Sequence, residues 1–167
     1  MKKVTTLLIA IVLVPALAFS QSKSIAEFHA KYRNMDHTTF VDISGSLFNF
    51  ASKIAEYSDE DDDETKAAGR VLSAIKAMQV LEVPYKMLDK ADISGLKSKM
   101  AGEKYEELMT VKEDDSNINI LAQGSGSKLE NITFLIDEDD SFVLVTIQGT
   151  LSMEDISYFA KHQKDWH

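Results

Sequence analysis

The chain has 167 residues, of which 44% are hydrophobic and 27% are charged, and it contains no cysteine. This composition is that of an ordinary soluble domain, so it argues against disordered, collagen-like and multi-span membrane proteins. The lack of cysteine excludes disulfides, thiolate zinc sites and cysteine nucleophiles. The formal net charge of −9 argues against a duplex nucleic-acid binder, which needs clustered lysine and arginine for the phosphates.

The first 20 residues are predicted to be a secretory signal peptide. Lys2 and Lys3 form a short positive region, and residues 7–19 are an apolar run of 13 residues. A membrane-spanning helix needs about 20 apolar residues, so the run is too short to cross and fits the core of a secretory signal. Cleavage is expected after Ser20 or, as the alternative, after Ala18. An uncleaved signal anchor is the competing interpretation.

Residues 21–167 are therefore expected to be the mature protein, which is periplasmic or secreted and folds as a single domain. A chain of this size buries about 68–70% of its unfolded surface, so a core is feasible without disulfides. No cysteine stands at a cleavage point, so we expect no lipid anchor and no stable membrane anchor after cleavage.

The first half of this domain alternates helices and strands. A capping box of Ser24 and Glu27 predicts a helix over residues 24–34, and the β-branched stretch 38–43 predicts a strand. A second helix follows, and the acidic run 58–64 favours the start of a third helix, because acids stabilise a helix N-terminus. The apolar stripe of the second helix is Leu47, Phe50, Ala51 and Ile54, and that of the third is Ala68, Val71, Leu72 and Ile75.

The second half is dominated by strands. Residues 78–83 read as a strand ended by Pro84, and Asp92 or Ser94 is expected to cap a fourth helix that ends near residue 106. Short, turn-forming connectors then separate four predicted strands, at 107–113, 117–123, 130–136 and 142–149. A last amphipathic helix is expected from Ser152, with its apolar stripe formed by Met153, Ile156, Phe159 and Ala160.

These elements predict an α+β fold. Its antiparallel sheet consists of a C-terminal four-strand meander plus two earlier strands, with the helices packed mainly on one face. The stretch 142–147 is apolar on both sides, so we expect it to be central in the sheet and covered on both faces. In the strand 117–123, Asn117, Asn119 and Gln123 are expected on a wet face.

The whole pattern resembles a known family. The most distinctive parts are residues 105–109 and the final strand, Phe142 to Gly149. Short motifs at residues 41–44, 74–76 and 111–113 strengthen the resemblance. The chain is similar, over nearly all of residues 24–160, to exported proteins of Bacteroidota grouped as domain-of-unknown-function family 4252. The resemblance implies export, a single α+β domain and an unassigned activity. Because no catalytic motif defines the family, it assigns no residue a role. Family members are often encoded near sigma-factor and anti-sigma genes, an association that hints at envelope sensing.

No metal site is predicted from the acidic residues or the histidines. The run 59–64 fails as a calcium loop, because position six would be Glu64 rather than glycine and position twelve would be Arg70 rather than glutamate. The cluster 137–140 is interpreted as a charged turn between strands. The histidines, His29, His37, His162 and His167, include no pair at the spacing of two ligands on one helix.

No catalytic or cofactor-binding residue is predicted either. Ser73 and Lys76 form an S-x-x-K pair without its companion motifs, and residues 124–128 lie between strands rather than between a strand and a helix, as a phosphate loop requires. Asn131 matches the glycosylation pattern but falls inside a predicted strand. Most aromatic residues are assigned to the core, whereas Phe48, Tyr57 and Trp166 are expected to be partly exposed.

Three hypotheses for function remain. The first is a non-enzymatic interaction or envelope-signalling module that binds another envelope protein. The second is a small-ligand or cation-binding protein that uses an apolar cleft or the acidic clusters. The third is an enzyme whose site is built from residues scattered in the sequence. The first is favoured because no acid–base or nucleophile motif is present.

Overall fold

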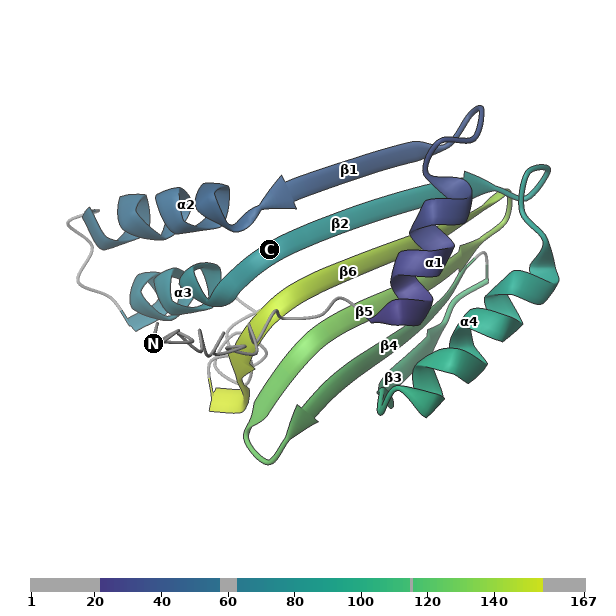
Figure 1. The fold of residues 1–167 in the computed structure, drawn as a ribbon. Coiled ribbons are helices and arrows are strands. Elements are labelled where there is room, and N and C mark those ends of the chain that lie inside the picture. Colours follow the sequence, from purple (N-terminus) through teal and green to yellow (C-terminus); the bar gives the residue numbers. More distant parts are fainter. Residues whose placement is uncertain (1–21, 58–62, 115, 155–167) are drawn as a thin grey trace, which may run out of the picture.

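A computed structural model describes residues 22–57, 63–114 and 116–154, and Figure 1 shows their arrangement. In chain order the elements are α1 (Lys23–Tyr32), β1 (Thr39–Ser44), α2 (Gly45–Tyr57), α3 (Asp63–Ala74), β2 (Ile75–Pro84), α4 (Lys90–Gly102), β3 (Glu106–Lys112), β4 (Ser116–Ser125), β5 (Lys128–Glu138) and β6 (Ser141–Ser152). None of the helices in these ranges is long and apolar enough to span a membrane.

The strands form one six-stranded antiparallel sheet in the order β1-β2-β6-β5-β4-β3. The last four strands are a meander, and β2 and β1 extend the sheet beyond β6. The α+β class, the meander and the two earlier strands are thus confirmed. The prediction that the final strand is central is also confirmed, because β6 pairs with β2 on one side and β5 on the other.

The main core lies between α1, α4 and one face of the sheet. Tyr32 and Met100 project from the two helices onto Leu81 and Leu144 of the central strands, and all four are fully buried. Phe28 and Phe142 pack edge to face with their ring centroids 5.7 Å apart. This cluster gives the sheet one well-covered face (Figure 1).

Two helices are capped by a residue upstream of the one that the sequence predicted. Ser22, not Ser24, caps α1: its hydroxyl accepts from the Ile25 amide at 3.3 Å. Asp89, not Asp92 or Ser94, caps α4 through the Ala91 amide at 2.9 Å. In each case another acceptable capping residue lies just upstream, and capping preferences alone do not discriminate between the two.

Helices α2 and α3 pack against each other at one end of the sheet (Figure 1). The junction between α3 and β2 fits closely against two glycines. A Cβ atom on Gly149 of β6 would lie 2.3 Å from the Ala74 carbonyl oxygen, and one on Gly45 would lie 2.5 Å from the Lys76 carbonyl oxygen. Only glycine permits this approach of the backbones.

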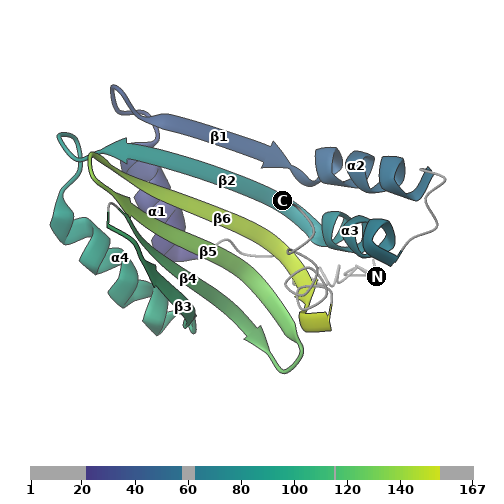
Figure 2. The same cartoon turned by 180° about the vertical axis from the view of Figure 1, so that it is seen from behind.

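In the part of the chain that the structure describes, the opposite face of the sheet is open along its centre, as Figure 2 shows. Among the described elements, α2 and α3 contact this side only near one end, through Phe48, Val71 and Ala74. Val143, Val145 and Ile147 of β6 point to it and are half-buried. The expectation that both faces of β6 are covered is therefore not met by the residues that the structure describes. We call this side the open face.

The predicted wet face of β4 is wrong. Asn119 is 7% exposed and lies in the same cross-strand row as Leu135 and Leu144, on the face covered by α1 and α4. Its amide accepts from the Lys97 ammonium of α4 at 2.7 Å and donates to Thr110 Oγ1 at 2.8 Å. The alternation of polar and apolar residues along β4 showed that they lie on two faces of the strand. It could not show that the helices would cover the polar face.

Some predictions fall outside the described residues. These are the signal peptide at 1–20, the greater part of the acidic run 58–64, and the last helix beyond Glu154. The start of that last helix is visible: Met153 and Glu154 are helical, and the Ser152 hydroxyl accepts from the Glu154 amide at 3.1 Å.

Candidate functional site

Charged side chains connect α1 to α4 on the outer surface of the helix layer. The Lys31 ammonium and the Tyr32 hydroxyl both donate to the Asp92 carboxylate. Lys99 donates to Glu27 at 2.8 Å. Each cation of this contact is therefore already paired with an acid from the other helix.

The pKa values follow this pairing. The hydrogen bond from Lys31, reinforced by that from Tyr32, holds the pKa of Asp92 below its usual value, and the same bond to Asp92 raises the pKa of Lys31. The hydrogen bond between Lys99 and Glu27 lowers the pKa of Glu27 and raises that of Lys99. None of these carboxyls is held protonated near neutral pH, so none is set up as a general acid.

A cavity of about 320 Å³ lies over these pairs, between the two helices. Its lining consists of Ser24, Glu27, Phe28, Lys31, Asp92, Gly95, Leu96 and Lys99. A charged ligand would have to displace partners that already satisfy one another. The arrangement thus joins the helices and offers no unpaired charge to a ligand.

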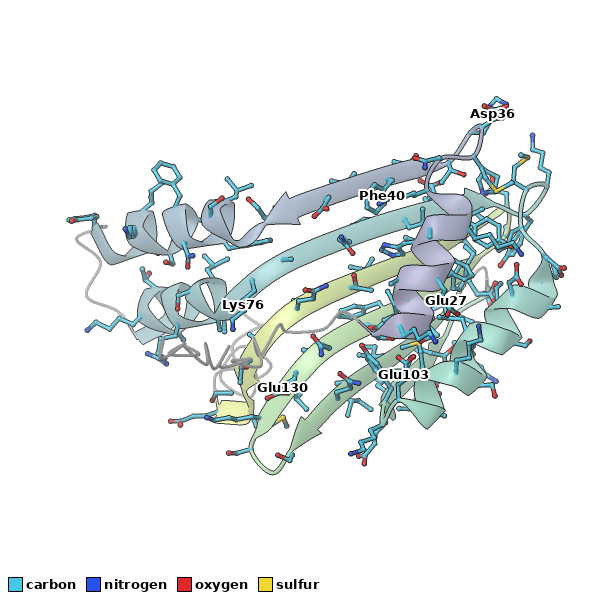
Figure 3. All side chains as sticks on the ribbon, viewed as in Figure 1. Glu27, Asp36, Phe40, Lys76, Glu103 and Glu130 are labelled. Atoms are coloured by element: carbon cyan, nitrogen blue, oxygen red, sulfur yellow. The ribbon has the colours of Figure 1, made fainter. Side chains whose placement is uncertain are left out.

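The carboxylate of Glu103 caps the start of α1 from the end of α4. It accepts from the Ser22 hydroxyl, from the Ser24 amide at 2.9 Å and from the Ser24 hydroxyl at 3.1 Å. Figure 3 labels Glu103 and Glu27 near this contact. An acid at a helix N-terminus satisfies free amides and the helix dipole, so this contact holds α1 in place.

His29 of α1 is a buried imidazole. Its ring packs edge to face on Phe40 with centroids 5.5 Å apart, and its Nε2 atom has no hydrogen-bond partner within the described part of the chain. Burial is the main cause that lowers the pKa of His29 to about 4; the Arg33 charge adds to this effect and the Asp42 charge opposes it. The ring is neutral at pH 7 and shielded from solvent, so it belongs to the core.

Helix α2 carries a row of large apolar side chains on its exposed side. Leu47, Phe50, Ile54 and Tyr57 are 56%, 63%, 56% and 87% exposed. Leu47, Phe50 and Ile54 belong to the apolar stripe that the sequence predicted, and Tyr57 was expected to be partly exposed, but the sequence assigned Phe50 to the core and Phe48 to the surface. The structure reverses the two, because Phe48 packs toward α3 and the sheet. We call these four residues the α2 stripe.

The open face of the sheet is a second apolar surface. One cross-strand row runs over all six strands without a polar residue, and it consists of Val41, Val80, Val145, Phe134, Ile120 and Met109. Its two edge members are the most exposed, with Val41 at 43% and Met109 at 55%. The row is apolar throughout, and the α2 stripe carries no carboxylate, imidazole or amine; its one polar atom is the Tyr57 hydroxyl.

Comparison with known proteins places the chain in a family. The model described as "Domain of unknown function (DUF4252)" matches residues 32–159. The chain belongs to this family. The resemblance that the sequence suggested is thereby confirmed, and no activity is assigned to the domain. No curated protein and no solved structure shows a significant match.

The remaining sequence motifs take structural places in this DUF4252 domain. Ser73 lies in the last turn of α3, where its hydroxyl donates to the Arg70 carbonyl at 2.8 Å. Lys76 lies in the next element, β2. Residues 124–128 form the β4–β5 hairpin, in which Gly126 adopts a φ of 64°. Asn131, within β5, donates to the Gln123 side chain at 2.7 Å.

The described members of the acidic and histidine candidates are not brought together. The cluster 137–140 joins β5 to β6, and its exposed members line a shallow depression with Ser116. In the described ranges no three His, Cys, Asp or Glu side chains are grouped for a metal ion. His37 is exposed, and His162 and His167 lie outside those ranges.

Proposed function

We propose that this DUF4252 domain is a non-enzymatic, exported interaction module that binds another envelope protein through the α2 stripe. The observation that carries the proposal is the exposure of four large apolar side chains in one row of one helix. Soluble monomers seldom leave so contiguous an apolar surface in water, and such patches mark binding sites.

The spacing of the stripe supports a particular mode of binding. Its members are three, four and three residues apart, so they lie along one side of α2. A helix of this kind binds by placing its apolar side in a groove of the partner. The partner is therefore a protein with an apolar groove.

The polar surface supports a binding role rather than an enzymatic one. Lys31, Asp92, Lys99 and Glu27 pair with one another across two helices, and Glu103 caps a helix. A small-ligand role has one observation in its favour, the cavity between α1 and α4. A ligand there would have to replace those pairs, so we place this role second.

Two surface variants test the proposal. Phe50→Ser and Ile54→Ser remove apolar groups that are already in water, so we expect the urea midpoint of each variant to stay within error of the parent. When tagged protein captures partners from its own envelope fraction, each variant should bind the partner at least about tenfold more weakly, since a buried apolar anchor contributes about 1.5–3 kcal/mol.

Lys53→Ser is the matched control, because Lys53 lies on the same helix, is exposed and is outside the stripe. This variant should capture the same amount of partner as the parent protein. Equal recovery of one partner by all three variants would contradict the use of α2. Capture that instead depends on Asp92 and Lys31 would favour the small-ligand cavity as the functional region.

A further inference from the structure

We propose that the chain segment after Glu154 folds back as an amphipathic helix and covers the open face of the sheet. This inference concerns the domain's own packing and is independent of the α2 stripe. The occupant is thus residues 155–167 of the same chain, rather than a second copy or a partner.

The first argument is where the described chain ends. β6 lies in the middle of the sheet, and Leu151, near its end, is buried in the apolar cluster on the side of the open face. A helix has already started there: Ser152 caps Glu154, and the Met153 amide donates to the Ser127 carbonyl at 2.9 Å. The described chain therefore ends beside the open face.

The second argument is the sequence of the segment. Met153, Ile156, Phe159 and Ala160 recur at helical spacing, while Tyr158, Lys161 and His162 fall on the opposite side of the same helix. A helix over residues 153–165 would be about 20 Å long. The strands beneath it are 10–12 residues long in β2, β5 and β6, or about 35 Å, so the helix fits within the face.

The third argument is the extent of the family domain. The match runs to residue 159, past the end of β6 and through Ile156 and Phe159. The apolar half of the segment therefore belongs to the domain. A six-stranded sheet that is apolar on both sides needs a layer on each, and α1 and α4 supply only one.

The first test measures stability in protein spanning residues 21–167. Ile156→Ser should raise the equilibrium constant for unfolding in urea by about tenfold or more, because it removes a buried side chain. Tyr158→Ser, on the other side of the expected helix, should leave the constant nearly unchanged. Equal effects of the two substitutions would overturn the proposal.

A double-mutant cycle then locates the contact. Val145→Ala on the open face should cost clearly less in the Ile156→Ser background than in the parent, whereas Val83→Ala on the covered face should cost the same in both. The two test residues are matched in chemistry and lie on neighbouring strands. If the stability losses are additive for Ile156→Ser with Val145→Ala as well as with Val83→Ala, the segment does not touch the open face.

A spin label settles the identity of the occupant, even if Ile156→Ser fails to fold. Because the chain has no cysteine, Lys161→Cys provides a single attachment point. The label should broaden the methyl signals of Val143 and Val145 and leave those of Ile93 and Leu96 on α4 sharp. No broadening overturns the proposal, and so does broadening that occurs only between labelled and unlabelled chains, since the occupant would then be a second copy.

Discussion

At the scale of single residues, the buried polar groups of α1 differ in how they are satisfied. Ser22 and Ser24 share the Glu103 carboxylate, whereas His29 is buried with its Nε2 atom unpartnered in the described structure. A buried polar atom without a partner costs stability, and the cost grows when the atom must also take a proton. The fold therefore disfavours the protonated form of His29.

We therefore expect acid to destabilise the domain through His29. Its folded pKa, about 4, lies below its ordinary value of 6.5, so the unfolded chain binds the proton more tightly. Stability is complete above pH 6.5 and is lost as the pH falls toward 4. Between pH 7.5 and 5 this single group should remove about 2 kcal/mol from the free energy of unfolding. Urea melts at the two pH values measure the loss.

His29→Phe keeps an aromatic ring against Phe40 but cannot titrate, so the variant should lack most of this loss. The exposed His37 has a φ of 60°, which asparagine tolerates, so His37→Asn is the control and should retain the loss. If His29→Phe and the parent lose stability equally between the two pH values, the acid sensitivity comes from other groups.

At the scale of elements, strands were easier to predict than the sides of helices. Short turns and β-branched runs located β3–β6 to within a few residues, because hairpins are specified locally. Three members of the α2 stripe were also predicted as one apolar row, but the sequence could not show that α3 would pack against Phe48 and leave Phe50 in water. That choice depends on which faces meet in the tertiary structure, as does the burial of Asn119 beneath Lys97.

The close approach of β6 to the α3–β2 junction gives a test of this packing. Gly149→Ala places a methyl group 2.3 Å from the Ala74 carbonyl oxygen, so the backbone must move. We expect a loss of about 1–3 kcal/mol in the free energy of unfolding, as for other overpacked sites. Thermal and urea melts check it.

Gly95→Ala is the matched control, since a Cβ at Gly95 of α4 meets nothing within 4 Å. Alanine is the better helix former, so this variant should gain up to about 1 kcal/mol. A Gly149→Ala protein as stable as the parent would mean that β6 and the junction can separate without cost.

At the scale of the whole molecule, the sequence could not show which apolar surfaces stay exposed. It contained the apolar residues of the open face, but strand alternation alone cannot show which side the helices cover. The α1–α4 ion pairs were not predicted at all, because their members lie about 60–70 positions apart in the chain. The sequence alone showed no catalytic motif and suggested a family that no catalytic motif defines. Both observations favour a search for function among the exposed surfaces.

The last prediction concerns export, on which the proposed envelope role depends. We expect protein from the native host to lack residues 1–20, because a 13-residue apolar run suits a cleavable signal better than a span of about 20 residues. The cap of α1 uses Ser22, so cleavage after Ser20 leaves that contact with Glu103 intact. Intact-mass measurement decides between this site and the one after Ala18. A Val12→Arg variant, with a charge inside the apolar run, should stay uncleaved and in the cell. A full-length mass in the membrane fraction of the parent would replace the exported module with a membrane-anchored one.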